Sequence, residues 1–293
     1  MRFTSPTQKF TSRLELRQRS KKAMASTYWT VADSTGSRRF ASRARRMTAC
    51  ALSFYYRVVT PDNDATRVEI SNTRPCRIRT CPACAAYGAK LMREKMNLLF
   101  NEVLTEHPDA RILLLTLTLP SQPIATCSLD SLQAALKRFW KMPEVRGVTL
   151  GQRTSIEAKM SGTKEHPTMH GHAHCGVVVK GPVYFITGLP AVHQTTWASW
   201  WQKAAKMDRK PVVDIRAVKS WDGATDPAAM ARAWREITKY AFSPEGVFQH
   251  GEDGITVDPA VVLALDNALR NKRLCTYDRC FKDAAKRLKK SRS

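Results

Sequence analysis

The sequence predicts an α+β fold, in which an antiparallel sheet of the ferredoxin-like, split βαβ type is backed by helices and preceded by a Cys-rich segment like a zinc knuckle. Two observations predict it. Short apolar runs have the length and alternation of strands, and longer segments repeat apolar residues at helical spacing. Along the chain these segments follow the order strand, helix, strand, strand, helix, strand, which is the split βαβ order.

The first three elements lie in the middle of the chain. Residues 111–118 are a short apolar run between two prolines, and we expect a buried strand there. Residues 128–141 are expected to be a helix, because Ser128 or Asp130 can cap it and large apolar residues recur at intervals of three and four. Residues 147–159 are expected to form the second strand.

The later elements follow with turn residues between them. Residues 170–180 are expected to form a strand that ends in three valines before Gly-Pro, and residues 211–219 alternate like another strand. Between them, residues 195–206 predict a helix with three tryptophans. Residues 226–242 predict a helix with an Asp cap and Pro in its first turn, and residues 257–273 predict a further helix.

Composition divides the chain into four segments. Residues 1–48 are rich in Arg, Lys, Ser and Thr and are expected to be a basic, mobile arm. Residues 49–105 hold the Cys-rich segment and a helix, and residues 106–285 hold the sheet and its C-terminal helix. Residues 286–293 are expected to be a short basic tail.

The net charge indicates the kind of partner. The chain has 48 Lys and Arg against 25 Asp and Glu, a balance of +23. Such an excess favours a polyanionic partner, most commonly nucleic acid, although a basic surface without a specific ligand has the same composition. No apolar run approaches the roughly 20 residues of a membrane helix, and no apolar stretch follows the basic start as in a secretory signal. We therefore expect a cytoplasmic protein that does not contact a membrane.

Three histidines indicate a metal site. His170, His172 and His174 alternate along one expected strand, so their side chains point to the same face and can converge on one cation. Imidazoles suit transition ions and tolerate Mn²⁺, whereas Mg²⁺ would need a nearby carboxylate, which Glu157 on the preceding strand could supply. Structural histidines are the alternative, and the spacing equally suits a zinc hydrolase.

One helix carries a candidate nucleophile. Glu236 and Tyr240 are four residues apart and therefore neighbours on the expected helix. Tyrosine is a poor nucleophile unless it is activated. Lys239 would favour its anion, and Glu236 could accept a proton. The alternative is that Tyr240 packs in the core while Glu236 faces solvent.

The cysteines indicate a second metal site. Cys76, Cys81 and Cys84 form a C-x4-C-P-A-C segment, and Cys50 lies upstream. Four thiolates make a closed tetrahedral zinc site, and clustered cysteines in a reducing compartment are more often metal ligands than disulfides. The alternative is a set of reduced cysteines in a small core. Arginines around the segment could help to grip DNA, and they are Arg74, Arg77 and Arg79.

Four pieces of the chain, in order, resemble the rolling-circle replication initiators of small bacterial plasmids, a branch of the HUH endonucleases. Residues 113–118 (LLLTLT) are similar to the first motif of that family, and residues 170–175 (HGHAHC) look like its histidine motif. Residues 212–216 (VVDIR) are similar to a strand ahead of the nucleophile, and residues 236–240 (EITKY) look like the tyrosine motif. The family also carries a similar Cys-rich segment before its first motif.

The resemblance implies roles for individual residues. His172 and His174 correspond to the metal-binding pair, and either Glu157 or His170 would be the third ligand, because the family often has proline where this chain has glycine between the first two histidines. Tyr240 corresponds to the nucleophile. Glu236 matches a carboxylate that helps to end the reaction in this branch.

The resemblance also implies a reaction. With Mn²⁺ or Mg²⁺ bound, the tyrosine would nick a locally single-stranded plasmid origin, forming a 5′-phosphotyrosine and a free 3′-hydroxyl that primes synthesis. No phosphate-cradling loop is present in the sequence, so strand separation must come from a partner helicase, from supercoiling or from an extruded hairpin. A host helicase is therefore an expected partner. The alternatives are an HUH relaxase or transposase with the same chemistry, and a non-catalytic, zinc-bearing DNA-binding regulator.

Overall fold

A computed structural model describes residues 6–50, 54–59, 67–73, 75–163, 165–180, 185–186, 189–190, 192–218, 234–238 and 246–290. The chain divides into two compact units. Unit 1 comprises Met1–Gly88 and Pro244–Asp266, and unit 2 comprises Ala89–Ser243 and Asn267–Ser293. None of the described helices is both long and apolar enough to cross a membrane.

Unit 1 is built from helices and two small hairpins. Its first helices, α1 and α2, pack closely against each other. Helices α3 and α9 each begin in unit 1 and end in unit 2. The elements are α1 (Pro6–Thr35), α2 (Arg38–Thr48), the hairpin β1 (Phe54–Val59) with β2 (Arg67–Thr73), α3 (Pro82–Glu106), the hairpin β10 (Gln249–Gly251) with β11 (Gly254–Thr256), and α9 (Pro259–Leu269).

The N-terminal segment is helical where the sequence led us to expect a mobile arm. Met24, Tyr28 and Val31 of α1 are buried, and so are Phe40 and Met47 of α2. These residues recur at helical intervals, but they are separated by so many Arg, Lys and Ser residues that the apolar period is hard to see in the sequence. The segment therefore contributes a core of its own to unit 1.

Unit 2 contains an antiparallel sheet, which confirms the predicted α+β class. Its main strands lie in the order β12, β5, β6, β3, β9, and every neighbouring pair is antiparallel. The small strand β4 (Gln122–Pro123) pairs with β6, and β7 (Phe185–Ile186) pairs separately with β8 (Leu189–Pro190). The main strands are β3 (Arg111–Thr118), β5 (Thr149–Gly162), β6 (Pro167–Val179), β9 (Asp214–Ala217) and β12 (Cys275–Arg279).

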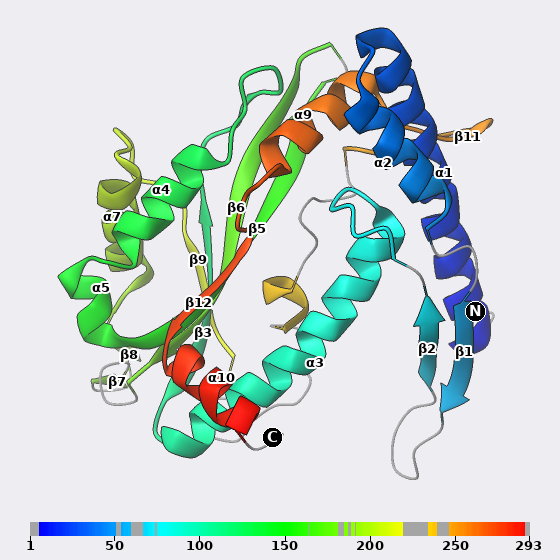
Figure 1. Cartoon of the computed structure of the whole chain (residues 1–293). Coiled ribbons are helices and arrows are strands. Elements are labelled where there is room, and N and C mark those ends of the chain that lie inside the picture. Colours follow the sequence, from blue (N-terminus) through cyan, green and yellow to red (C-terminus); the bar gives the residue numbers. More distant parts are fainter. Residues whose placement is uncertain are drawn as a thin grey trace, which may run out of the picture. The chain divides into compact units, whose positions relative to one another are not determined.

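Helices cover both faces of this sheet (Figure 1). On one side lie α4 (Asp130–Phe139) and α7 (Gln194–Ala205), with the short α5 (Pro143–Val148) next to them. The Phe139 and Trp201 rings meet edge to face at 5.7 Å, and the Trp201 indole N–H donates to the Thr118 carbonyl at 2.9 Å. The other side carries the unit 2 part of α3 together with α10 (Cys280–Lys290).

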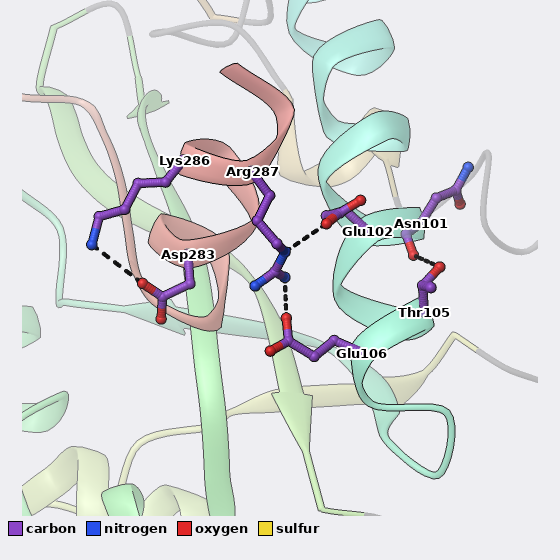
Figure 2. A network of polar contacts seen from close by, with 7 residues as sticks. All are labelled: Asn101, Glu102, Thr105, Glu106, Asp283, Lys286 and Arg287. Carbon is purple, nitrogen blue, oxygen red and sulfur yellow. Dashed lines mark hydrogen bonds and ion pairs between the residues drawn. The ribbon is translucent and has the colours of Figure 1, made fainter. Parts of the chain in front are cut away.

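The core on the α3 side includes a helical turn at residues 234–237. The ring of Phe100 in α3 lies tilted against that of Trp234, with centroids 3.9 Å apart, and meets the ring of Phe281 in α10 edge to face at 4.7 Å. At the helix surface, Arg287 of α10 bonds Glu102 at 2.6 Å and also pairs with Glu106 (Figure 2). Because these ion pairs are partly exposed, the buried aromatic rings contribute more to holding α10 in place than the charges do.

Helix and strand positions agree with those predicted from the sequence through most of unit 2, but β12 and residues 286–290 differ, and one predicted helix lies mostly outside the described residues. Of the helix expected over residues 226–242, only residues 234–238 lie within the described part of the chain. The edge strand β12 was not expected, because its residues, Cys-Thr-Tyr-Asp-Arg, lack apolar alternation. Residues 286–290, expected to be a basic tail, belong to α10.

Gly176 of β6 lets the turn at residues 234–237 approach the sheet closely. A Cβ at Gly176 would lie 2.7 Å from Ile237 Cδ1 and 3.0 Å from Phe100 Cζ. Both distances are shorter than ordinary contacts, so a larger residue would displace the turn or the ring. Because Gly176 has no side chain, the turn that contains Glu236 can pack directly on the sheet.

We expect Gly176→Ala to lower the free energy of unfolding by about 1–3 kcal/mol, because the added methyl overpacks this contact. Urea unfolding followed by tryptophan fluorescence measures the effect. The matched control is Gly88→Ala, since Gly88 lies in α3 and a Cβ added to it would have no atom within 4 Å. Helix propensity predicts about 0.5–1 kcal/mol of stabilisation there. Equal effects of the two substitutions would contradict the packing argument.

Candidate active site and cysteine cluster

The ladder between β5 and β6 gathers the predicted metal ligands on one face of the sheet. His170, His172 and His174 alternate along β6, and Glu157 of β5 is paired directly with His172. Directly paired residues of an antiparallel ladder point to the same side, so the carboxylate shares the histidine face. The structure thus places on one face of the sheet the four residues that were predicted from the sequence as candidates for the active-site metal, although among the described residues their ligand atoms are not gathered closely enough to form a ready metal site.

Glu157 and His174 form a buried hydrogen-bonded pair. The Glu157 Oε2 and His174 Nε2 atoms are 3.0 Å apart, and the two residues are only 7% and 5% exposed. On the other side of the ring, His174 Nδ1 lies 3.4 Å from the Thr116 hydroxyl of β3. Contacts at both nitrogens fix the plane of the imidazole. Of the two, the Thr116 contact at Nδ1 corresponds to the outer partner of a histidine whose Nε2 binds a metal.

His172 has a buried nitrogen with no described partner. Its Nε2 atom is inaccessible to solvent and forms no hydrogen bond within the described part of the chain. Burial lowers the pKa of His172 to about 4, with further lowering from the charges of His170 and His174. The ring is therefore neutral near pH 7, the form in which imidazole binds a metal. A buried nitrogen without a partner is consistent with a ligand that binds there.

His170 is engaged differently from the other two histidines. Its Nδ1 atom lies 3.1 Å from the hydroxyl of Ser121 and 3.4 Å from that of Ser161. Its ring centroid is 4.5 Å from that of His172, whereas the rings of His172 and His174 stack nearly parallel at 5.9 Å. The serine contacts give His170 polar partners outside the pair formed by Glu157 and His174.

Two residues on β9 extend the histidine face, and neither was predicted as a site residue. Asp214 pairs with Thr116, which in turn pairs with His174, so all three lie in one row across the sheet. Asp214 accepts a two-pronged contact from Arg216, with both N–O distances at 3.0 Å. The alternation of these polar residues along β9 is a signal that could have placed them on this face.

Glu236 lies close to this face. The turn that carries it packs onto Gly176, the next residue after His174 on the same side of β6. The pKa of Arg216 is raised, first by its hydrogen bonds to Asp214 and also by the negative charge of Glu236, which links the turn to β9. Lys239 and Tyr240 lie outside the described residues.

The four predicted zinc ligands come together in unit 1. The sulfur atoms of Cys50, Cys76, Cys81 and Cys84 all lie within 4.8 Å of one another, with the shortest separations at 3.4 and 3.5 Å. A tetrahedral ion with Zn–S bonds of about 2.3 Å would place its sulfurs about 3.8 Å apart. Among the residues that the structure describes, no other group of three or more His, Cys, Asp or Glu side chains is as compact.

Local backbone structure builds this cluster. Cys81 directly precedes α3, Pro82 begins the helix, and Cys84 lies in its first turn. Backbone N–H groups donate to two sulfurs: that of Cys76 to Cys50 and that of Arg77 to Cys84, both at 3.3 Å. These donors, like a helix N-terminus, favour thiolates over thiols.

Hydrogen bonds among the thiols also favour thiolate at Cys50. The pKa of Cys50 is lowered, first by hydrogen bonds from Cys76 and Cys81, whereas hydrogen bonds within the cluster, first those with Cys50, raise the pKa of Cys76 and Cys81. Of the arginines predicted to accompany the cluster, Arg77 and Arg79 are exposed and Arg74 lies outside the described residues. The cluster can therefore hold a metal ion and presents positive charge beside it.

Comparisons with known proteins agree on one family. A family model described as "Replication protein" matches residues 67–293. A curated protein from Streptococcus pneumoniae serotype 2 (strain D39 / NCTC 7466) named "Protein rep" is 28% identical over 218 residues, which cover 74% of this chain but only 64% of that relative. A "Protein rep" from Bacillus sp is 27% identical over 286 residues, 90% of this chain and 87% of the relative. No solved structure matches.

The pKa of His172 generates a prediction. In metal-free buffer its imidazole resonances, assigned with His172→Gln, should titrate by NMR with a midpoint near pH 4. In the unfolded chain the ordinary pKa is about 6.5, so the unfolded state takes up the proton first as the pH falls. The stability associated with neutral His172 is complete above pH 6.5 and should be lost progressively between about pH 6.5 and 4. A midpoint at or above 6.5 would show that the ring is solvated.

Proposed function

This chain belongs to the replication protein family, and on that basis we propose that it initiates rolling-circle replication of a plasmid by nicking one DNA strand with Tyr240. The observation that carries the proposal is the shared face of unit 2 on which Glu157, His172 and His174 gather, with Glu236 close by. In this assignment residues 106–285 are the nicking domain and residues 49–105 the Cys-rich segment.

The sheet supports the relation to HUH nucleases. The order β9, β3, β6, β5, with all neighbours antiparallel, is the order expected when two split βαβ halves form one ferredoxin-like sheet. We therefore assign the central four strands and the helices α4 and α7 to that fold, with β12 as an added edge strand.

Glu157, His172 and His174 would hold the active-site ion. Two imidazoles and one carboxylate suit Mn²⁺, and the carboxylate also permits Mg²⁺. When bound, a divalent ion at this position would polarise the scissile phosphate. We favour Glu157 over His170 as the third ligand, because Glu157 already contacts His174 whereas His170 contacts two serines.

The protein's own residues would carry out the strand transfer. The Tyr240 oxygen attacks phosphorus and forms the phosphotyrosine bond, while the bond between phosphorus and the 3′ oxygen breaks and that oxygen gains a proton. Lys239 favours the tyrosine anion, and Glu236 accepts the proton of the hydroxyl or, when the reaction ends, that of water.

The cysteine cluster would hold structural Zn²⁺. Its four sulfurs complete a tetrahedral set without an open position, as in structural rather than catalytic zinc sites. The exposed Arg77 and Arg79, together with Arg74, would then contact DNA phosphates. We further propose that origin DNA is the substrate, that a host helicase separates the strands, and that the protein acts in the cytoplasm.

Two other functions share some of these features. A relaxase or transposase of the HUH class would use the same residues. A zinc-bearing DNA-binding regulator without catalytic activity would account for the charge and the cysteines, but not for a carboxylate and two histidines joined on one sheet face. A nicking assay with a Tyr240 variant separates an enzyme from a regulator.

Replacement of Tyr240 should abolish nicking. The protein is incubated with Mn²⁺ and single-stranded origin oligonucleotides labelled at either end, and products are separated on a denaturing gel. We expect a covalent adduct with the fragment on the 3′ side of the nick, and at least a 10³-fold slower reaction for Tyr240→Phe, because the nucleophile is missing. DNA bound without any adduct by the unaltered protein would instead indicate a regulator.

Removal of a buried cysteine should release zinc. We expect about one Zn²⁺ per chain in the purified protein by elemental analysis, and much less in Cys81→Ser, since Cys81 is fully buried within the cluster. Cys175→Ser provides a control, because Cys175 is fully buried in unit 2 and is not one of the clustered cysteines. Equal zinc content in both variants would rule out the cluster as the metal site.

A further inference from the structure

We propose that the arginine face of α2, formed by Arg38, Arg39, Arg43, Arg45 and Arg46, binds the phosphate backbone of double-stranded DNA. The proposal rests on and extends the proposed function, because it assigns the binding of duplex DNA to a surface of unit 1, whereas the nicking residues belong to unit 2. Helix α2 lies outside the part of the chain that the family model matches, which begins at residue 67.

Helix geometry places the arginines together. Phe40, Ala44 and Met47 are buried and define the inward side of α2. At 100° per residue, the five arginines fall within one arc of about 160°, which begins beside the buried side of the helix and extends over its exposed side. The helix contains no acidic residue, so nothing within α2 neutralises this arc.

A buried carboxylate fixes one flank of the face. Asp266 is 2% exposed, and it accepts contacts from Arg43 at 2.9 Å and Arg39 at 3.2 Å. The Tyr28 hydroxyl also donates to Asp266, at 3.2 Å, and lies 2.7 Å from the Thr80 hydroxyl. Two of the arginines are thereby held in place before any ligand binds, which reduces the entropy lost on binding.

The cysteine cluster fixes the other end of the face. Arg46 donates to the Cys76 carbonyl at 2.5 Å, and Cys50 follows α2 by two residues. The exposed Arg77 and Arg79 lie on the segment that joins two ligands of the cluster. The positive surface therefore continues from α2 onto the cysteine cluster within one unit.

The two remaining arginines are available to a ligand. Arg38 and Arg45 are exposed, and neither forms an ion pair with the described residues. An exposed guanidinium binds phosphate oxygens in a two-pronged manner. Each such contact releases counterions from DNA and makes affinity depend on salt.

The composition of the face favours duplex over single-stranded DNA. Proteins that bind single strands stack bases on exposed aromatic rings, but the one aromatic residue of α2, Phe40, is buried. A helix of 11 residues is about 16 Å long, enough to follow the phosphates along one edge of a groove. A rigid, arginine-lined helix without stacking residues thus fits regularly spaced phosphates.

The test compares salt-dependent binding of the full chain to two probes. A labelled duplex of about 30 base pairs, long enough for roughly three helical turns, and one of its strands are titrated by fluorescence anisotropy at several KCl concentrations. The salt slope is the slope of the logarithm of the binding constant against the logarithm of the salt concentration. For Arg38→Ala/Arg45→Ala we expect its magnitude on the duplex to fall by about 1.8, because each of the two lost phosphate contacts contributes about 0.9. The affinity should fall roughly 10- to 30-fold near 0.15 M salt. The affinity for the single strand should change much less.

Three controls make the result interpretable. Arg209→Ala removes an exposed arginine of unit 2 and should leave both affinities unchanged. Arg38→Lys/Arg45→Lys retains the charge and should restore the slope. Unchanged circular dichroism and melting temperature exclude loss of folding, since both side chains are exposed.

Several outcomes would overturn the proposal. An alanine variant that binds duplex like the unaltered protein, or that loses affinity equally for duplex and single strand, contradicts a duplex-binding face. The nicking assay on single-stranded oligonucleotides is run in parallel. If the unaltered protein fails to nick while the alanine variant still loses duplex binding, the proposed function is wrong and the duplex-binding face stands.

Discussion

The pairing of β5 with β6 is the constraint on which the candidate active site depends. Its register sets Glu157 opposite His172 and leaves His174 within reach of the same carboxylate. If the register shifted by one residue, the side chains of one strand would exchange faces, and its polar side chains would point to the side of the sheet that α4 and α7 cover. The long ladder, with apolar residues packed on that side, opposes such a slip, so the hydrophobic pattern also fixes the position of the polar groups.

The second requirement is a close approach from a distant part of the sequence. The turn bearing Glu236 reaches the histidine face because Gly176 leaves space for Ile237 beside Phe100. A contact between aromatic and aliphatic side chains thus determines where a charged group lies. The same core includes α10, which Arg287 ties to α3 at the surface. Packing and chemistry share one side of the sheet, with the apolar residues at one end and the histidines at the other.

The sequence predicted the histidine strand and the cysteine cluster because the signals for both are local. Alternation along β6 placed three histidines on one face, and the spacing around Cys81 indicated a metal cluster. Other features depend on partners far along the chain. Burial of Tyr28 in α1 requires Asp266, the contact of His174 with Thr116 requires a strand pairing, and β12 forms as an edge strand despite its polar residues. Neither composition nor periodicity reports such partners.

The cysteine cluster has a consequence for how unit 1 is put together. Three of its sulfurs come from the region that the family model matches, but Cys50 comes from the preceding segment. A bound ion would therefore act as a cross-link that closes the loop from residue 50 to residue 76. This loop contains the β1–β2 hairpin. The start of the family-model match at residue 67 is consequently not a folding boundary. A chain cut there would lack Cys50 and leave the ion with three ligands and an open coordination position.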